Sequence, residues 1–467
     1  MNALVKFVTM CLLFSFIAAC AAPPTAAPEA TQPPTTAPEA TQPPTAAPEV
    51  TQPPQPVETT TGGEKVKLLF WDFGNYNTTP LEQSLAKDES EWYINEAIAR
   101  FEAENPDIDV EYFEQNGEQS TELMTAAGMS GSGPDVVSLW GGQYVITIKD
   151  ALLPLNDYFS EEERAQNPGW ENHMSDGKYY GNPINKQVTA IYINKSLFDK
   201  AGVDPTEYDG TYDSLVNISE KFKSAGIVPL AMGVADGWGL SFLEGSLYSS
   251  QVPDAESELK DMAAGNSNYS DNPALVAAFK AVQNLYAKGF FNDDVATIPQ
   301  EQALTKFANG EAAMFTSGDW DLLALQEAMG DSLAVLPMPS MSADSVNFGT
   351  AIGGLGGDAI GVAAYSKHPD EAIRLVKFLR SYPEERERFK KTGRLPNITG
   401  DYSDIPMSPE LTELAKITNV TFFVDNQLPG DIPDKWFSNE SLMLTNQMSV
   451  EDFLKEWDIS RDEALGK

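Results

Sequence analysis

From Lys65 onward, short apolar strands alternate with amphipathic helices, and this alternation is the feature that most restricts how the chain can fold. Residues 66–71, 109–113 and 136–139 have the length and apolar content of buried strands. Between them, the spacing of apolar residues predicts helices over 91–105 and 118–129. This β-α-β-α-β order predicts a mostly parallel sheet covered by helices, with ligands at the carboxyl ends of its strands.

Aromatic and polar residues follow the first and third of these strands. They are Trp71, Asp72, Asn75, Asn77, Trp140 and Gln143. Because the carboxyl ends of parallel strands meet at one edge of a sheet, we expect these side chains to contribute to a ligand site.

The N-terminus has a different character. Residues 7–19 are apolar but number only about 13, short of the roughly 20 that a spanning helix needs, so residues 1–19 are predicted to be a signal peptide. The three residues before Cys20 resemble the bacterial lipobox, which implies that Cys20 is lipidated and becomes the mature N-terminus. A plain signal peptide with an incidental cysteine is the alternative.

Residues 25–54 consist of three copies of a ten-residue repeat, TAAPEATQPP, TTAPEATQPP and TAAPEVTQPP. Proline removes backbone donors and fixes backbone angles, and the repeat has almost no residue able to pack in a core. We therefore expect residues 20–64 to be a disordered tether between a membrane anchor and a folded region. An O-glycosylated stalk would have the same composition.

Cysteine and histidine are scarce. Cys11 lies inside the expected signal peptide, and Cys20 would carry lipid, so no disulfide is expected. The chain has two histidines, His173 and His368. This scarcity disfavours a histidine-rich metal centre and a histidine-based hydrolase, and we expect neither a metal nor a cofactor.

The chain is strongly acidic. It has 31 Lys and Arg against 69 Asp and Glu, a formal net charge of -38. Such a field repels nucleic acid and anionic ligands, so neutral or cationic ligands fit better and no nucleic-acid partner is expected. Solubility in an exposed compartment would also explain this charge.

Five segments together carry a family resemblance. They are DGKYYGNP at 176–183, IYINKSLFDKAGV at 191–203, SAGIVPLAMG at 224–233, FANGEAAMFTSGDW at 307–320 and SKHPDEAIRLVKFL at 366–379. Through their order and spacing, the chain from Lys65 to about residue 440 resembles the extracellular solute-binding proteins of family 1, the sugar-binding lipoproteins that serve ABC importers.

The resemblance implies an α/β fold of two lobes, like that of maltose-binding protein, with a ligand cleft between lobes that close by hinge motion. Chain crossings are expected near 183–187, 336–339 and 394–396. The predicted lobes are therefore 65–185 with 338–393 for lobe one, and 186–337 with 394–467 for lobe two.

A sugar site needs aromatic platforms for the C–H faces of the ring and polar groups for its hydroxyls. Trp320 is the central candidate, because in this family the aromatic residue at this position commonly stacks on the sugar. The other candidates beyond the first and third strands are Lys186, Gln187, Trp238, Asp319, Gly353, Gly354, Arg394 and Trp436. Each tryptophan has a core position as its alternative, the glycines a simple bend, and Arg394 a structural ion pair.

The expected protein is a lipid-anchored, extracytoplasmic and monomeric binding protein without enzymatic activity. It would bind a neutral sugar or oligosaccharide and deliver this ligand to the permease of an ABC importer. The alternatives are a binder of a peptide or cationic osmolyte, a secreted glycoside hydrolase acting through two carboxylates, and an adhesion module that binds a protein through its acidic surface.

Overall fold

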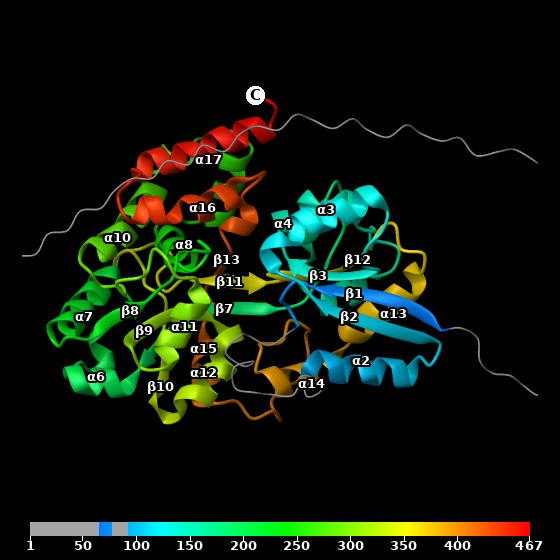
Figure 1. Cartoon of the computed structure of the whole chain (residues 1–467), viewed down its shortest axis with the longest axis horizontal. Coiled ribbons are helices and arrows are strands. Elements are labelled where there is room, and N and C mark those ends of the chain that lie inside the picture. The colour runs from blue at the N-terminus through cyan, green and yellow to red at the C-terminus, as the bar shows by residue number, and fades with distance from the viewer. Residues whose placement is uncertain (1–64, 77–91) are drawn as a thin grey trace, which may run out of the picture. The chain divides into compact units, whose positions relative to one another are not determined.

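Two main β-sheets organise the described part of the chain, residues 65–76 and 92–467 of a computed structural model (Figure 1). The first sheet has the strand order β2-β1-β3-β12-β6. The second has the order β13-β11-β7-β9-β8, and β10 also pairs with β7. The predicted signal peptide, Cys20, the tether and Asn77 lie outside the described residues.

The first sheet has the parallel arrangement that the sequence predicts. Its strands are β1 (Val66–Asp72), β2 (Ile108–Glu114), β3 (Val136–Trp140), β6 (Asn182–Pro183) and β12 (Asp358–Val362). Strand β1 pairs in parallel with both β2 and β3, whereas β12 is antiparallel to β3. Helices α2 (Tyr93–Glu104) and α3 (Ser120–Ser130) make the connections, so the β-α-β-α-β prediction is confirmed.

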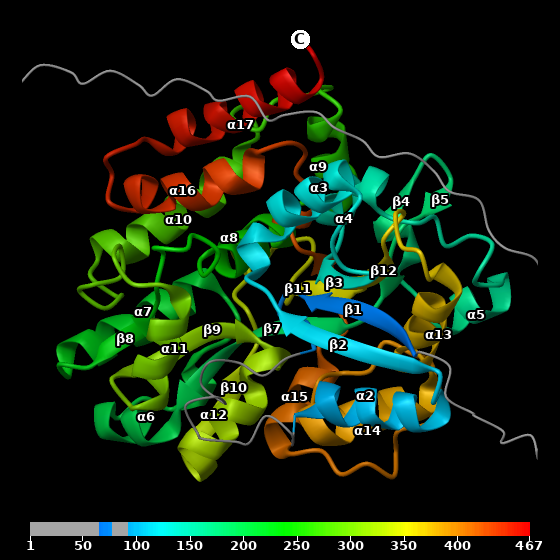
Figure 2. The same cartoon turned by 45° about the vertical axis from the view of Figure 1, so that its right-hand side comes forward.

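Helices cover both faces of this sheet (Figure 2). Phe70 of β1 packs in one cluster with Ile94 of α2 and Val376 of α13 (Pro369–Leu379). Val137 of β3 packs in another cluster with Met124 of α3. The alternation of side chains along each strand therefore supplies two cores, and α13 packs on the sheet as its apolar face predicts.

The second sheet is built around the nine-residue strand β7 (Lys186–Asn194), which is buried along nearly its whole length. Its other strands are β8 (Val228–Ala231), β9 (Ala312–Gly318), β10 (Leu333–Leu336), β11 (Ala351–Leu355) and β13 (Val420–Phe422). The chain leaves β7 directly into α6 (Lys195–Ala201), where the Asn194 side chain accepts a hydrogen bond from the Leu197 amide. Gly202 ends the helix with φ +67°, a left-handed conformation that favours glycine.

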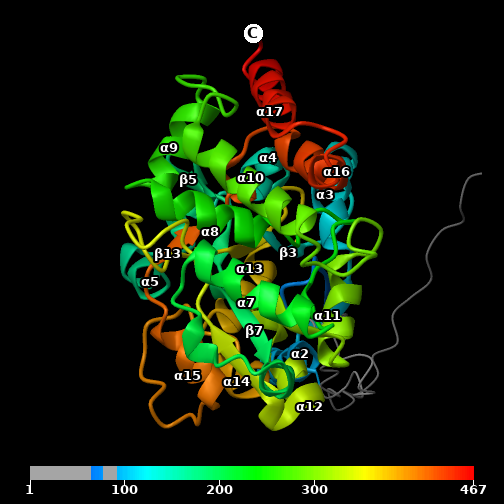
Figure 3. The same ribbon diagram turned by 90° about the vertical axis from the view of Figure 1, so that its left-hand side faces the viewer.

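The remaining helices surround the two sheets. They are α4 (Gln143–Thr147), α5 (Glu161–Gln166), α7 (Tyr212–Ser224), α8 (Ser241–Gln251), α9 (Ala255–Ala263), α10 (Pro273–Ala287), α11 (Gln300–Ala308), α12 (Leu322–Met329), α14 (Tyr382–Thr392), α15 (Pro409–Lys416), α16 (Ile432–Leu444) and α17 (Val450–Ala464). A small hairpin is formed by β4 (Met174–Ser175) and β5 (Lys178–Tyr179). Helices α16 and α17 pack together against α10 (Figure 3). Within the described ranges, no helix combines the length and the apolar character that crossing a bilayer requires.

The chain passes from the first sheet to the second and later returns to the first. The first passage lies at 184–185, between β6 and β7, and Asn185 forms a bridge with Pro396 of the third predicted crossing. The second crossing is not at 336–339, because β11 still pairs with β7 and β13 in the second sheet. The chain returns to the first sheet at Gly356 and Gly357, immediately before β12. Residues 351–355 therefore belong to the second sheet rather than to the predicted lobe one.

Candidate ligand-binding cavity

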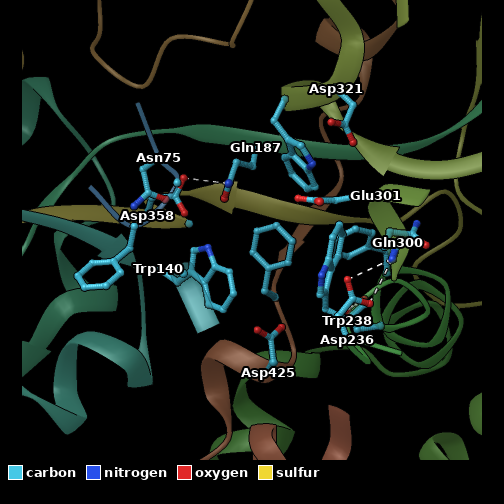
Figure 4. A pocket seen from close by; sticks show the side chains of 18 of the residues that line it. Asn75, Trp140, Gln187, Asp236, Trp238, Gln300, Glu301, Asp321, Asp358 and Asp425 are labelled. Atoms are coloured by element: carbon cyan, nitrogen blue, oxygen red, sulfur yellow. Dashed lines mark hydrogen bonds between the residues drawn. The ribbon is translucent and has the colours of Figure 1, made fainter. Parts of the chain in front are cut away.

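A cavity of about 570 Å³ is lined by residues from both sheets (Figure 4). The first sheet and its loops contribute Phe73, Gly74, Asn75, Glu114, Gln115, Asn116, Gly117, Trp140, Gly357 and Asp358. Most of these residues follow the carboxyl ends of β1, β2 and β3. The parallel order of the three strands therefore brings these loops together at one edge, as predicted.

The second sheet and its helices contribute most of the aromatic lining. These residues are Asp236, Trp238, Ser241, Phe242, Pro299, Gln300, Glu301, Leu304, Phe315, Trp320, Asp321, Phe423, Asp425, Asn426 and Phe437, and Gln187 and Arg394 lie at the passages between the sheets. Several lie where a helix begins, because α8 starts at Ser241 and α11 at Gln300.

Three tryptophans, Trp140, Trp238 and Trp320, lie around the cavity, each of them partly buried. Phe242 contacts two of them, with ring centroids 5.6 Å from Trp238 and 5.5 Å from Trp320. Such edge-on and tilted contacts hold the two indole rings in place. The partly exposed rings offer flat apolar surfaces to a ligand.

Gly318 allows Trp320 to take its position. A Cβ atom added at Gly318 would lie 2.0 Å from the Trp320 ring. Any side chain at this position would therefore force the indole to move. The GDW segment thus places a glycine where the ring folds back over the end of β9.

Acidic and amide groups occupy the edges of the cavity. Asp236 accepts hydrogen bonds from the Gln300 amide at 3.1 and 3.3 Å, and Asp321 accepts one from the Ser317 hydroxyl. Asp358 accepts hydrogen bonds from the side-chain amides of Asn185 and Gln187. The cavity therefore presents mainly hydrogen-bond acceptors.

Charge in the lining is unbalanced. The acidic lining residues are Glu114, Asp236, Glu301, Asp321, Asp358 and Asp425. Among the described lining residues, Arg394 is the one with a cationic side chain, and its Nη1 donates a hydrogen bond of 2.6 Å to the backbone oxygen of Asn75. Burial raises the pKa of Asp358 to about 6, although the Arg394 charge opposes this shift, and burial also raises the pKa of Asp425 to about 6.

The structure brings together six of the predicted site residues. Asn75, Trp140, Gln187, Trp238, Trp320 and Arg394 line the cavity. The predicted residues that do not line it are Trp71, Asp72, Gln143, Lys186, Asp319, Gly353, Gly354 and Trp436.

Both acidic candidates stabilise the backbone rather than line the cavity. Buried Asp72 accepts hydrogen bonds from the Asn75 amide at 2.9 Å and the Tyr76 amide at 3.0 Å, and thereby shapes the turn after β1. Buried Asp319 accepts hydrogen bonds from the amides of Val188 at 3.0 Å and Leu395 at 3.2 Å. Asp319 thus ties together two segments that pass between the sheets.

Trp436 is a core residue. It is fully buried, with ring centroids 4.8 Å from Trp457 and 5.6 Å from Phe279, and its Nε1 donates to Glu440 at 2.8 Å. The next residue, Phe437, lines the cavity instead. On α16, two adjacent residues therefore face the core and the cavity, respectively.

The remaining candidates lie beside the cavity. Gly353 and Gly354 are within β11. A Cβ atom added at Gly353 would lie 2.0 Å from the backbone oxygen of Gln187, so this glycine permits close pairing with β7. Trp71 packs edge-on against Phe73, with centroids 6.4 Å apart. Gln143 begins α4, and Lys186 begins β7.

Several residues that line the cavity were not predicted from the sequence. They include Phe242, Glu301, Asp321, Asp358, Phe423, Asp425 and Phe437. Asp321 directly follows the GDW segment, and Asp358 directly follows Gly356 and Gly357, so the sequence next to both residues gave a signal. The others come from segments whose sequence gives no sign of facing the cavity.

The protein has an α/β fold, and its cavity is lined from two β-sheets by aromatic rings and hydrogen-bonding groups. These features are typical of two-lobe solute-binding proteins. The sequence profile of the family described as bacterial extracellular solute-binding protein matches residues 86–385, and the chain belongs to this family. This confirms the resemblance drawn from the five sequence segments.

Individual relatives agree with this assignment. The sn-glycerol-3-phosphate-binding periplasmic protein UgpB of Shigella flexneri serotype 5b is 28% identical over 66% of this chain and 72% of its own length. The galactooligosaccharide-binding protein of Bacillus subtilis strain 168 is 26% identical over 65% of this chain and 70% of its own. A solved chitin oligosaccharide binding protein has a TM-score of 0.74 at 22% identity, covering 87% of this chain and 100% of that chain, and shows the same fold.

Proposed function

We propose that this protein is the substrate-binding component of an ABC importer and binds a neutral sugar or oligosaccharide in the cavity. The observation that carries the proposal is the cavity itself, in which Trp140, Trp238 and Trp320 are combined with amide and carboxylate groups. Indole rings suit the C–H faces of a sugar, and the polar edge suits its hydroxyls. The volume of about 570 Å³ is within the usual range for a small-molecule site.

A phosphorylated ligand fits this cavity poorly, although the name of one relative specifies glycerol 3-phosphate. Phosphate sites rely on Arg or Lys donors, often in bidentate pairs. In the described lining, Arg394 already donates to the Asn75 oxygen, and six carboxylates would repel an anion. We therefore propose a ligand without phosphate.

In the proposed mechanism, the protein binds its ligand and does not change it chemically. Ligand binds to groups from both sheets, contacts with the second lobe favour a closed form, and this form docks on the permease. The relatives are named as binding proteins, which supports a protein that does not alter its ligand. The lobe ranges 65–185 with 338–393 and 186–337 with 394–467 remain predictions, apart from the β11 strand at 351–355.

The proposed location rests on family membership and on the N-terminal sequence. Members of this family are extracellular, which supports an extracytoplasmic protein. We further propose lipidation at Cys20, a tether over 20–64 and a monomeric protein. A lipid anchor would keep the binding protein near its permease.

A cationic osmolyte is the second candidate ligand. The observation that favours it is the excess of carboxylates in the lining, next to aromatic rings that can bind a cation through their faces. A peptide with a free amino group would satisfy the same chemistry.

Calorimetric titration of the unlipidated protein would test these alternatives. The panel would contain neutral mono- and oligosaccharides, glycine betaine, short peptides and glycerol 3-phosphate. We expect saturable binding of a neutral saccharide, no new reducing ends during incubation, and a loss of at least about tenfold in affinity for Trp320→Ala. Trp71→Phe is the matched control, because Trp71 lies beside the cavity without lining it. Binding of betaine or a peptide alone would overturn the sugar assignment.

A further inference from the structure

Arg394 lies at the cavity with only part of its guanidinium bound to protein. Its Nη1 donates to the backbone oxygen of Asn75 at 2.6 Å. The side chain is partly exposed and lines the cavity. Among the described residues, its Nε and Nη2 have no hydrogen-bond partner, and neither atom is enclosed by protein. One side of the guanidinium therefore binds the protein, and the other side has N–H groups that a ligand can reach.

The free side of this guanidinium has a definite shape. Its Nε–H and one Nη2–H point in parallel directions, so they can bind two neighbouring oxygen atoms at once. In a carboxylate or phosphate, such oxygens share a negative charge. In a sugar, they belong to two neighbouring hydroxyl groups, or to a hydroxyl group and the ring. Shape alone does not separate these two kinds of ligand, so the charge around Arg394 must do so.

Buried Asp319 is the first carboxylate that opposes the charge of Arg394. Its Oδ2 accepts a hydrogen bond from the amide of Leu395, the residue after Arg394, at 3.2 Å. Its Oδ1 accepts one from the amide of Val188 at 3.0 Å. Because both oxygens accept, this arrangement suits the ionised carboxylate. Burial raises the pKa of Asp319, and the Arg394 charge opposes this shift.

Buried Asp358 is the second carboxylate, and it is linked to Arg394 through Asn75 (Figure 4). With the Asn75 amide oriented to satisfy both of its ends, its nitrogen donates to Asp358 Oδ1 at 3.1 Å, while the backbone oxygen of Asn75 accepts from Arg394. Asp358 Oδ2 accepts from Asn185 and, at 3.0 Å, from Gln187 Nε2. Burial raises the pKa of Asp358 to about 6, and the Arg394 charge again opposes the shift.

The charge of Arg394 is thus more than balanced. One guanidinium and two ionised carboxylates together carry a net negative charge, which opposes the approach of an anion. A neutral oxygen acceptor meets no such repulsion. It can still accept hydrogen bonds from an ionised donor, and these are stronger than bonds between neutral groups.

We propose that Asp319 and Asp358 make Arg394 selective for a neutral pair of oxygen acceptors, such as two neighbouring sugar hydroxyls, and against a carboxylate or phosphate. This inference rests on the proposed function and adds a specificity-determining residue to it. Asp319 does not line the cavity, so it acts through its charge rather than through contact with the ligand.

Anion binding tests the two carboxylates without knowledge of the sugar. Inorganic phosphate and glycerol 3-phosphate would be titrated by calorimetry at pH 8, well above the pKa of Asp358. We expect the wild type to bind neither anion, and Asp358→Asn and Asp319→Asn to bind both. Adding Arg394→Gln to either variant should abolish this binding. Circular dichroism and thermal unfolding would establish that each variant is folded, since both carboxylates also hold amide groups.

Asp425→Asn is the matched control. Asp425 also lines the cavity, and burial also raises its pKa to about 6, but Arg394 is not among the groups that shift this pKa. Anion binding by Asp425→Asn as strong as that by Asp358→Asn, or anion binding that persists with Arg394→Gln, would reveal a general effect of charge and overturn the proposal. Phosphate binding by the wild type, or none by the folded variants of Asp319 and Asp358, would also overturn it.

Neutral saccharides test the paired hydrogen bonds of Arg394. Maltose, lactose and cellobiose would be included in the panel and titrated into the wild type, Arg394→Gln and Arg394→Lys. For a saccharide that binds the wild type, we expect a loss of about tenfold in both variants, because lysine keeps the charge but lacks the parallel N–H groups. Full affinity in Arg394→Lys would overturn the paired contact. Failure of every saccharide to bind the wild type would instead refute the proposed function, whereas the anion titrations would still decide the role of the two carboxylates.

Discussion

Glu244 and Glu440 form a buried pair of acids, and replacing one of them tests how this core tolerates charge. Glu244 on α8 and Glu440 on α16 interact with each other in the core, and Trp436 Nε1 donates to Glu440 at 2.8 Å. Among the described residues, both oxygens of Glu244 and Oε1 of Glu440 have no hydrogen-bond partner. Burial raises the pKa of both carboxyl groups, so the pair retains protons in the folded state.

The magnitude follows from proton linkage. An ordinary glutamate has a pKa of 4.5, so between that pH and neutral pH the folded state binds protons that the unfolded state has released. Each such carboxyl group therefore lowers stability by about 1.4 kcal/mol for each pH unit as the pH rises, which amounts to about 3 kcal/mol per group at pH 7. Glu440→Gln removes this cost and retains an acceptor for Trp436. We expect the variant to be more stable by up to about 3 kcal/mol at pH 7, and by about 1 kcal/mol at pH 5.5.

Urea unfolding of both proteins at pH 5.5, 7 and 8 would measure the difference. Glu385→Gln is the matched control, because Glu385 is equally buried but faces Arg380 and Arg388, which hold its pKa at about 2. Removing that charge should destabilise the fold by about 3–5 kcal/mol. If Glu440→Gln were less stable than the wild type at pH 7, or if its advantage did not grow with pH, the pair would not be protonated and the reasoning would fail.

Two further predictions concern the site and its support. Gly318→Ala should displace Trp320, because the ring lies 2.0 Å from the added Cβ position. Ligand affinity measured by calorimetry should fall at least about tenfold, while the circular dichroism spectrum stays unchanged. Unchanged affinity would contradict the role of Trp320. His173 is buried with its Nε2 3.0 Å from the Gly356 oxygen, and burial lowers its pKa to about 4. The unfolded state therefore binds more protons at this residue below pH 6.5, so the contribution of His173 to stability should fall by about 1.4 kcal/mol per pH unit as the pH decreases from about 6.5 to 4. Over this range the wild type should lose more stability per pH unit than His173→Gln in urea unfolding, and parallel pH dependences of the two proteins would refute the argument.

The excess of carboxylates in the cavity bears on ligand choice beyond any single residue. A negative lining favours ligands rich in donors, and a polyol such as a sugar offers a donor at every hydroxyl. The same lining opposes sugar acids and sugar phosphates. Competition titrations with an acidic and a neutral form of one sugar would measure this discrimination.

Local patterns in the sequence were sufficient to predict much of the scaffold. The three strands beginning near residues 66, 108 and 136 and the helix over 369–379 depend on apolar periodicity and capping, which are properties of short segments. The position of the site followed from topology, because parallel strands bring their carboxyl ends to one edge. Trp140 and Trp320 lie at such ends, and both line the cavity.

The sequence by itself therefore determined the family, the alternation of strands and helices, and the segments from which a site would be built. Only the tertiary structure decided which side chains enter the cavity. Trp436 and Phe437 are adjacent in sequence, yet the first packs in the core and the second lines the cavity, because successive residues of a helix point about 100° apart. The return to the first sheet at Gly356 and the gathering of Asn185 and Gln187 on Asp358 likewise depend on contacts between segments about 170 residues apart. Long-range packing, which no local pattern records, sets these contacts.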